Sequence, residues 1–231
     1  MLFQLSLLRE PQNWKPLLLL LCIFFLRESG GKSSVFVYTV YLFRSAGVTV
    51  DPFICTLLVG VSRLITILLC ALIIDKVGRK TIFMTCTMIC IISLHVAGGT
   101  LMSGIENDFV KWVPLISVLT FTTSYCLGMS PIPWPLASEL LPLPVKSISI
   151  SIVCFTYSIS LFAITNIFPT LLETCGLGAS FLIFSVSYII LFIIVGLFLP
   201  ETKKKTLTEL EKAFLPKSKK ANVKNAEHVS I

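Results

Sequence analysis

The chain has 231 residues, of which 55% are hydrophobic and only 13% are charged, and its mean hydropathy is +0.90. Soluble domains contain about 25% charged residues, so this chain has too few polar side chains to cover a globular surface in water, which excludes an ordinary water-soluble enzyme. The abundance of Leu, Ile, Val and Phe excludes a disordered chain, and we expect the net charge of +7 to mark membrane orientation rather than a nucleic-acid partner.

The first apolar stretch, residues 16–43, is long enough to cross a bilayer, which takes about 20 mostly apolar residues. It is interrupted at residues 27–32 by the sequence R-E-S-G-G-K. Its beginning, residues 17–26, also fits the apolar core of a cleaved signal peptide. A cleaved segment would leave the β-branched and aromatic run 35–43 as a leader without an evident purpose, so we favour a membrane-spanning helix.

Ionisable groups inside a membrane span are costly, so those in this interruption are candidate functional residues. Glu28 and Lys32 are four residues apart and can neutralise each other on one helix face. Gly30 and Gly31 weaken the helix at the same point, and a break in a span needs polar surroundings. Two interpretations are equally supported: a solute site at the midplane of a transporter, and a charge-paired kink buried against a neighbouring helix.

Five further windows meet the length and apolarity of a membrane-spanning helix. They are residues 53–74, 81–102, 112–134, 147–168 and 179–199. With the first stretch, they predict an all-α membrane protein with six transmembrane helices. Arg63 lies well inside the second span, where it needs a carboxylate or a wet cavity; Glu28 is the nearest candidate, and the pair would tie the first two spans together.

The fourth of the six spans ends in the sequence G-M-S-P-I-P-W-P at residues 128–135, in which three prolines stand at alternate positions. Pro131 and Pro133 remove backbone donors and clash with the preceding turn, so no regular helix can run through them. Trp134 offers a flat apolar face and one N–H donor, which suits stacking on a sugar ring. A tryptophan there is also typical of the membrane interface.

Charged residues gather at one membrane face, in the short connections and at the start of the tail. They are Asp75, Arg79, Glu139, Lys146 and Glu201. Opposite charges at this face would hold helix ends together until transport separates them. A surface pair contributes only about 0–1 kcal/mol, which suits a gate that has to open.

The lysines and arginines predict the orientation, because positive charge in short loops marks the cytoplasmic side. With six spans, most of them lie inside if both termini are cytoplasmic. The predicted organisation is a cytoplasmic N-terminal segment (1–15), a transmembrane bundle (16–199) and a cytoplasmic basic tail (200–231). Residues 207–214 allow a short amphipathic helix, and the tail either contacts anionic lipid or is simply solvated.

Cysteine and histidine give no sign of a metal site or of catalysis. The eight cysteines mostly lie in apolar runs, where cysteine behaves as a small hydrophobe, and no C-x-x-C motif occurs. The only histidines, His95 and His228, lie in a span and in the tail, without a visible nucleophile–base pairing. We therefore expect no disulfide framework, no metal, no cofactor and no enzymatic activity.

Taken in order, several motifs resemble the sugar porter family, the glucose-transporter-like branch of the major facilitator superfamily. They are D-x-x-G-R-K at 75–80, P-I-P-W at 131–134 followed by Glu139 and Lys146, and P-E-T-K at 200–203. The resemblance extends to about residue 215 and is strongest to the insect facilitated trehalose transporters within this family. Family members have twelve spans, so it implies the C-terminal half of the fold, spans seven to twelve, in the plasma membrane.

The resemblance also implies a set of substrate-binding residues, in which this chain departs from the family. The paired glutamines of span seven fall on Arg27 and Glu28, and the asparagine after them falls on Ser33. An asparagine of span eight falls on Arg63, and the asparagine–tryptophan pair of span eleven begins at Tyr157. Charges or bulk thus replace neutral amides, the motif tryptophan is kept, and Lys146 replaces a usual arginine in the gate.

Three hypotheses for the function follow. The first is a facilitated-trehalose-transporter-like carrier that moves a hexose or trehalose by alternating access. The second is a truncated, non-transporting half-unit that associates with a full-length transporter, and the third is a proton-coupled carrier of another polar solute. The expected partners are a sugar or other small polar solute, the lipid bilayer, and a missing N-terminal half or a full-length relative.

Overall fold

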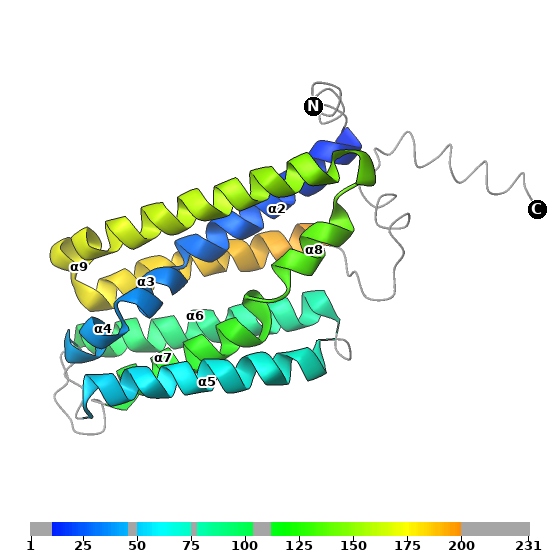
Figure 1. Cartoon of the computed structure of the whole chain (residues 1–231). Helices are drawn as coiled ribbons and strands as arrows, with labels where there is room; N and C mark the ends of the chain where they lie inside the picture. Colours follow the sequence, from blue (N-terminus) through cyan, green and yellow to red (C-terminus); the bar gives the residue numbers. More distant parts are fainter. Residues whose placement is uncertain (1–10, 46–49, 75–77, 104–111, 200–231) are drawn as a thin grey trace, which may run out of the picture.

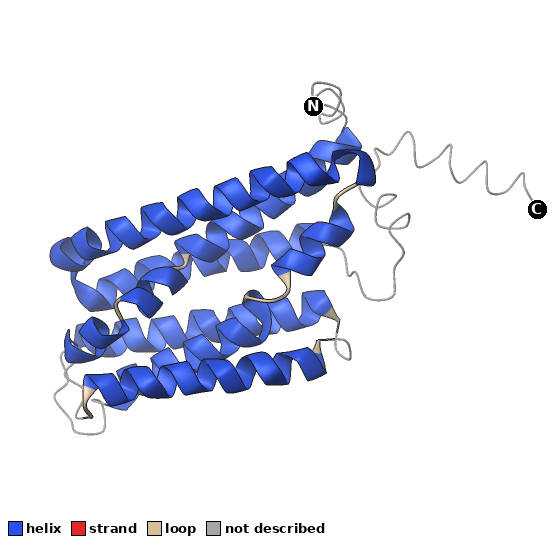
Figure 2. Ribbon diagram, in the orientation of Figure 1, coloured by secondary structure: helices blue, strands red, loops and turns tan. Residues whose placement is uncertain are grey.

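The computed structural model describes residues 11–45, 50–74, 78–103 and 112–199, and all regular structure in these residues is helical (Figure 2). The α-helices are α2 (Pro11–Ser29), α3 (Lys32–Val37), α4 (Thr39–Ser45), α5 (Pro52–Ile73), α6 (Arg79–Ser103), α7 (Val113–Ser124), α8 (Pro133–Leu140) and α9 (Lys146–Phe198). A π-helical turn, η2 (Tyr125–Met129), follows α7, and a 3-10 turn, η3 (Leu143–Val145), precedes α9. The predicted helix at 207–214 lies outside the described residues.

Four helical stretches are long and apolar enough to cross a membrane, judged by length and composition in the described residues. They are Pro52–Leu72, Arg79–Ser103, Val113–Leu140 and Leu143–Phe198. The last one contains two of the predicted windows, because α9 is continuous through Pro169 and turns at Gly176, whose φ of 79° and ψ of 170° are not helical. The prediction of an all-helical, multi-pass membrane chain is confirmed, whereas the count of six spans is not.

The first predicted span is divided into α2, α3 and α4. Gly31 separates α2 from α3 with a φ of +77°, a left-handed conformation that glycine adopts without a Cβ penalty. A Cβ atom on Gly30 would lie 2.1 Å from the Tyr188 ring, and one on Gly31 would lie 2.1 Å from the Phe184 ring. The rings of Tyr188 and Phe184 on α9 therefore pack directly against the interruption.

The proline-rich segment after α7 interrupts the spanning stretch Val113–Leu140. The π turn η2 ends at Met129, residues 130–132 form a turn, and α8 begins at Pro133, a position where the missing proline N–H costs no helical hydrogen bond. The helix thus changes course next to Trp134, as its prolines require.

The helices pack mainly along α9. Figure 1 shows α2 beside the two arms of α9, with α5, α6 and α7 on the other side of the bundle. Gly98 of α6 and Gly178 of α9 allow these helices to approach closely, since a Cβ on Gly98 would lie 2.8 Å from the Gly178 carbonyl oxygen. In contrast, only 22% of the α5 stretch is buried, and its outward residues are large and apolar, as a lipid-facing helix requires.

Candidate functional site

A buried cluster of charged and polar side chains surrounds Glu28 at the end of α2. The Glu28 side chain is fully buried, and its Oε1 atom lies 3.2 Å from Arg27 Nη2 and 3.3 Å from Lys32 Nζ. Its Oε2 atom lies 3.2 Å from Lys32 Nζ and accepts a hydrogen bond of 3.0 Å from Ser33 Oγ. One carboxylate therefore binds two cations and a hydroxyl, and the left-handed turn at Gly31 brings Lys32 and Ser33 back toward it.

Arg27 links this cluster to the interrupted helix after α7. Arg27 Nη1 donates a hydrogen bond of 3.3 Å to the backbone carbonyl of Met129, which is 102 residues away in the chain. In a regular helix, that carbonyl would accept from the N–H four residues later, but position 133 is a proline and has none. The proline break thus frees a carbonyl at membrane depth, and a guanidinium satisfies it.

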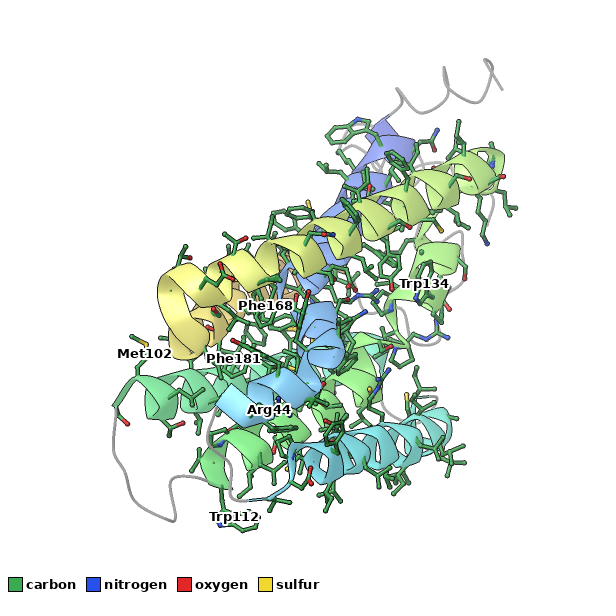
Figure 3. All side chains as sticks on the ribbon, turned by 60° about the vertical axis from the view of Figure 1, so that its left-hand side comes forward. Arg44, Met102, Trp112, Trp134, Phe168 and Phe181 are labelled. Carbon is green, nitrogen blue, oxygen red and sulfur yellow. The ribbon has the colours of Figure 1, made fainter. Side chains whose placement is uncertain are left out.

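Aromatic rings enclose the same cations. The Arg27 guanidinium lies 4.8 Å from the centroid of the Phe24 ring and 5.4 Å from that of Tyr157. Trp134 meets both rings edge-on, with centroids 4.9 Å from Phe24 and 5.7 Å from Tyr157. Trp134 is 41% exposed and projects from α8 near the first arm of α9 (Figure 3), so part of its ring remains free.

Lys32 is a cluster residue that was not in the predicted substrate-binding set. Its Nζ atom lies 5.6 Å from the ring centroids of both Tyr125 and Tyr157, and 13% of its side chain is exposed. Its four-residue spacing from Glu28 was the available signal, but the contact with the two tyrosines is tertiary. Lys32 is the cation of this cluster that reaches the surface of the bundle.

Arg63 lies apart from the Glu28 carboxylate. Its guanidinium is 4.0 Å from the ring centroid of Phe36 on α3, so it does link the first two predicted spans. Within the described part of the chain, the ion pairs of Glu28 are with Arg27 and Lys32. The expected pairing of Arg63 with Glu28 is therefore absent in the described residues. Lys32 and Ser33, which follow the turn at Gly31, already occupy the hydrogen-bonding positions of the carboxylate beside Arg27.

The predicted gate residues are partly brought together. Arg79, at the start of α6, forms an ion pair with Glu139 on α8, and their side chains are 28% and 30% exposed. Lys146 is half-buried at the start of α9. Asp75 and Glu201 lie outside the described residues.

Lys80 makes a contact at this end that the sequence did not reveal. Its Nζ atom donates a hydrogen bond of 2.9 Å to the Gly196 carbonyl in the last turn of α9. Carbonyls in the last turn of a helix lack backbone donors and favour nearby cations, and the residue four positions after Gly196 is again a proline. In both this contact and that of Arg27 with Met129, the sequence signal was a proline four residues after the carbonyl, because the proline leaves that carbonyl without its helical donor.

No group of three or more His, Cys, Asp or Glu side chains that could hold a metal ion occurs in residues 11–45, 50–74, 78–103 and 112–199. All eight cysteines lie in this part of the chain and are free thiols. The chemistry of the cluster is thus that of hydrogen bonding, charge and aromatic stacking.

Comparison with known proteins gives a consistent result. The family described as "Sugar (and other) transporter" matches residues 1–214. The chain is 32% identical over 212 residues to the facilitated trehalose transporter Tret1 of Culex quinquefasciatus. The matched region covers 90% of this chain and 41% of that protein. It is 31% identical over 226 residues to the protein of the same name from Drosophila willistoni, covering 94% of this chain and 26% of that one.

Two solved structures share the fold. One is the proton:xylose symporter XylE bound to 6-bromo-6-deoxy-D-glucose, with a TM-score of 0.74 and 23% identity over 86% of this chain and 42% of that chain. The other is the inward-open XylE from E. coli, with a TM-score of 0.73 and 22% identity over 85% and 41% of the two chains. The chain thus has the fold of part of a major facilitator superfamily transporter and spans less than half the length of these relatives.

Proposed function

This chain belongs to the sugar transporter family, whose members are transporters rather than enzymes, and we propose that it takes part in moving a sugar, a hexose or trehalose, across a membrane by alternating access. The observation that carries the proposal is the polar cluster at the interruption between α2 and α3, next to a partly exposed tryptophan. Broken helices that present polar groups in a membrane bundle suit a solute that has many hydroxyl groups.

In this proposal the chain crosses the membrane six times. The segments α2, α3 and α4 form one interrupted crossing, and the two arms of α9 form two crossings joined at Gly176. Residues 16–199 form the bundle, and residues 1–15 and 200–231 lie in the cytoplasm. The positive charge of the inner loops supports this orientation, and the family resemblance supports the plasma membrane as its location.

The proposed substrate-binding wall consists of six residues from five helices, α2, α3, α5, α8 and α9. They are Arg27, Glu28, Ser33, Arg63, Trp134 and Tyr157. The exposed face of Trp134 would stack on a sugar ring, the partly exposed polar residues would bind its hydroxyl groups, and the buried Glu28 would hold its cationic partners in place. The Arg79–Glu139 pair would act as the inner gate, since a partly solvent-exposed ion pair is weak enough to break during each transport cycle.

The second wall of the transport pathway would come from another six-span unit. The chain matches 41% of the Culex quinquefasciatus relative and 42% of the XylE chain, and one half-bundle supplies one side of a central cavity. We propose either a missing N-terminal half or a full-length relative as the source of the other side. The partly exposed members of this wall, Arg63, Trp134 and Tyr157, would otherwise face lipid, which cannot satisfy their polar groups.

Uptake measurements test the transport proposal. The chain is expressed in oocytes alone and together with the first half of a full-length relative, and the entry of radiolabelled trehalose and glucose is measured. We expect uptake when both halves are present. Trp134→Ala should then raise KM about two- to tenfold through loss of stacking, whereas the matched control Trp112→Ala, at the start of α7, should not. Equal KM values for the two variants would remove Trp134 from the site.

A second candidate function is a non-transporting half-unit that packs against a full-length transporter. The observation that favours it is the full burial and pairing of the Glu28 carboxylate within this chain, which suits a structural ion pair as well as a solute site. Co-purification of the tagged chain with a full-length relative, without any sugar uptake by the chain in either combination, would support this function. Uptake that depends on the chain would exclude it.

A further inference from the structure

We infer that the site selects a sugar that carries an anionic oxygen group, a carboxylate or a phosphate, and that Lys32 and Arg63 bind this group. The inference rests on the proposed transport function and narrows its substrate class. It begins from the charge balance of the site, where the carboxylate of Glu28 pairs with Arg27 and Lys32, and a third cation, Arg63, stacks on Phe36 without a carboxylate partner in the described residues. Each uncompensated charge at membrane depth is costly, so this excess of positive charge calls for a counter-charge.

The Glu28 carboxylate has no capacity left for a ligand. Its two oxygens already accept from Arg27, from Lys32 and from Ser33, and the side chain is fully buried. A substrate therefore meets the cations of this wall and not the carboxylate. The single negative charge of Glu28 neutralises one of its two cationic partners, Arg27 and Lys32, so this group of three residues keeps a net charge of one positive unit.

The other acidic side chains of the described residues lie elsewhere. Asp51 caps the first turn of α5, Glu139 is paired with Arg79, and Glu173 lies on α9 near its turn at Gly176. Arg63, by contrast, stacks on Phe36, and the Phe36 ring lies 6.3 Å from the Tyr125 ring that Lys32 also approaches. Two cations of the wall thus share one region that lacks a second carboxylate in the described part of the chain.

The hydrogen-bonding character of these side chains points to the same ligand. Lysine and arginine only donate hydrogen bonds, whereas sugar hydroxyls both donate and accept, so a wall of cations leaves hydroxyl protons without acceptors. Carboxylate and phosphate oxygens only accept, and their hydrogen bonds to cations are shorter and stronger than neutral ones. In addition, Arg27 Nε is a buried donor without a partner in the described residues.

The same wall offers a place for the sugar ring. Lys32 Nζ lies 5.6 Å from the Tyr157 ring centroid, and the Trp134 ring lies 5.7 Å from the same ring. Both side chains are partly exposed beside the same Tyr157 ring, and in this inference the sugar ring stacks on Trp134 while its charged group binds Lys32. A free carboxylate or phosphate without a sugar ring would use only half of this surface.

Binding measurements on the purified full chain in nanodiscs of zwitterionic lipid test the inference. Tryptophan fluorescence is titrated with glucuronate, glucose 6-phosphate, glucose and trehalose. We expect the two anionic sugars to bind about tenfold or more tighter than glucose, which is the range for hydrogen bonds to charged groups. Lys32→Gln should abolish this preference, Lys32→Arg should retain it, and the matched control Arg44→Gln, an exposed arginine of α4, should leave it unchanged.

The outcomes separate this inference from the proposed function. Glucose or trehalose binding as tightly as the anionic sugars would overturn the inference and leave sugar transport standing. Binding of no sugar at all would overturn the inference, whereas the transport proposal would fall only if uptake were absent with both halves present. Retention of the anionic preference in Lys32→Gln, in a sample that is monodisperse and helical by circular dichroism, would also overturn it. If inorganic phosphate or acetate binds as tightly as the anionic sugars, the sugar ring contributes nothing and the substrate class is wrong.

Discussion

Glu28→Gln removes the single negative charge of the polar cluster while keeping the size and shape of the side chain. The amide oxygen can still accept a hydrogen bond, so the main loss is electrostatic. Arg27 is only 2% exposed, and its remaining polar contact is with the Met129 carbonyl. The variant therefore leaves a buried guanidinium and a largely buried ammonium without a counter-charge.

The expected cost is large. Removing one partner of a buried ion pair destabilises a protein by about 3–5 kcal/mol, because the other charge stays buried and unpaired. Glu28 has two cationic partners, at 3.2 Å each, so we expect the variant to fall in this range. Glu139→Gln is the matched control, since its pair with Arg79 is about one third exposed and should contribute only about 0–1 kcal/mol.

The free energy of unfolding can be measured by titrating SDS into detergent micelles and following far-UV circular dichroism. Reaction of the buried cysteine thiols with a fluorescent maleimide gives a second, independent signal of opening. The double variant Glu28→Gln/Lys32→Gln removes one of the two stranded cations and should recover about 1–3 kcal/mol. Equal stability of Glu28→Gln and Glu139→Gln, or no recovery in the double variant, would refute the view that Glu28 holds a buried ion network.

Three further predictions concern the helix break, the gate and the topology. In the same SDS titration, Gly31→Ala should destabilise the chain by about 2 kcal/mol or more, because the backbone is left-handed there and the new Cβ atom would meet the Phe184 ring. The control Gly99→Ala should be neutral or stabilising, because no atom lies within 4 Å of the position of its Cβ atom. Arg79→Glu should impair oocyte uptake by placing two carboxylates together, and adding Glu139→Arg should restore it; failure of the double variant would argue against a gate pair. Epitope tags on the two termini should both become accessible only after permeabilisation, and tags on opposite sides of the membrane would contradict six crossings.

Local sequence predicted the helices well because membrane-spanning helices satisfy their backbone hydrogen bonds internally. The apolar windows at 53–74 and 81–102 match α5 and α6 closely. The glycines at 30 and 31 marked the interruption of the first stretch, since a residue without a Cβ atom weakens a helix wherever it stands. These properties depend on neighbours within a few positions in the chain.

The boundary between the last two windows was less well predicted. The sequence placed the end of a helix near Pro169, but the structure continues the helix through this proline and turns at Gly176. A proline removes one hydrogen bond and tilts a helix, which packing in a bundle can offset. A left-handed glycine changes the direction of the chain itself.

The sequence alone determined the class of the molecule, its apolar helices and the presence of charges at membrane depth, because composition and local spacing decide these features. Tertiary structure alone decided which charges meet: Arg27 reaches a carbonyl 102 residues away, and Arg63 stacks on Phe36 rather than pairing with Glu28. Partners of a charge in a low-dielectric interior depend on which side chains are close in space and still have a free donor or acceptor. The four-residue spacing in the chain contains that information for the pair of Lys32 with Glu28. Local spacing does not contain it for a cation whose partner lies on a distant helix.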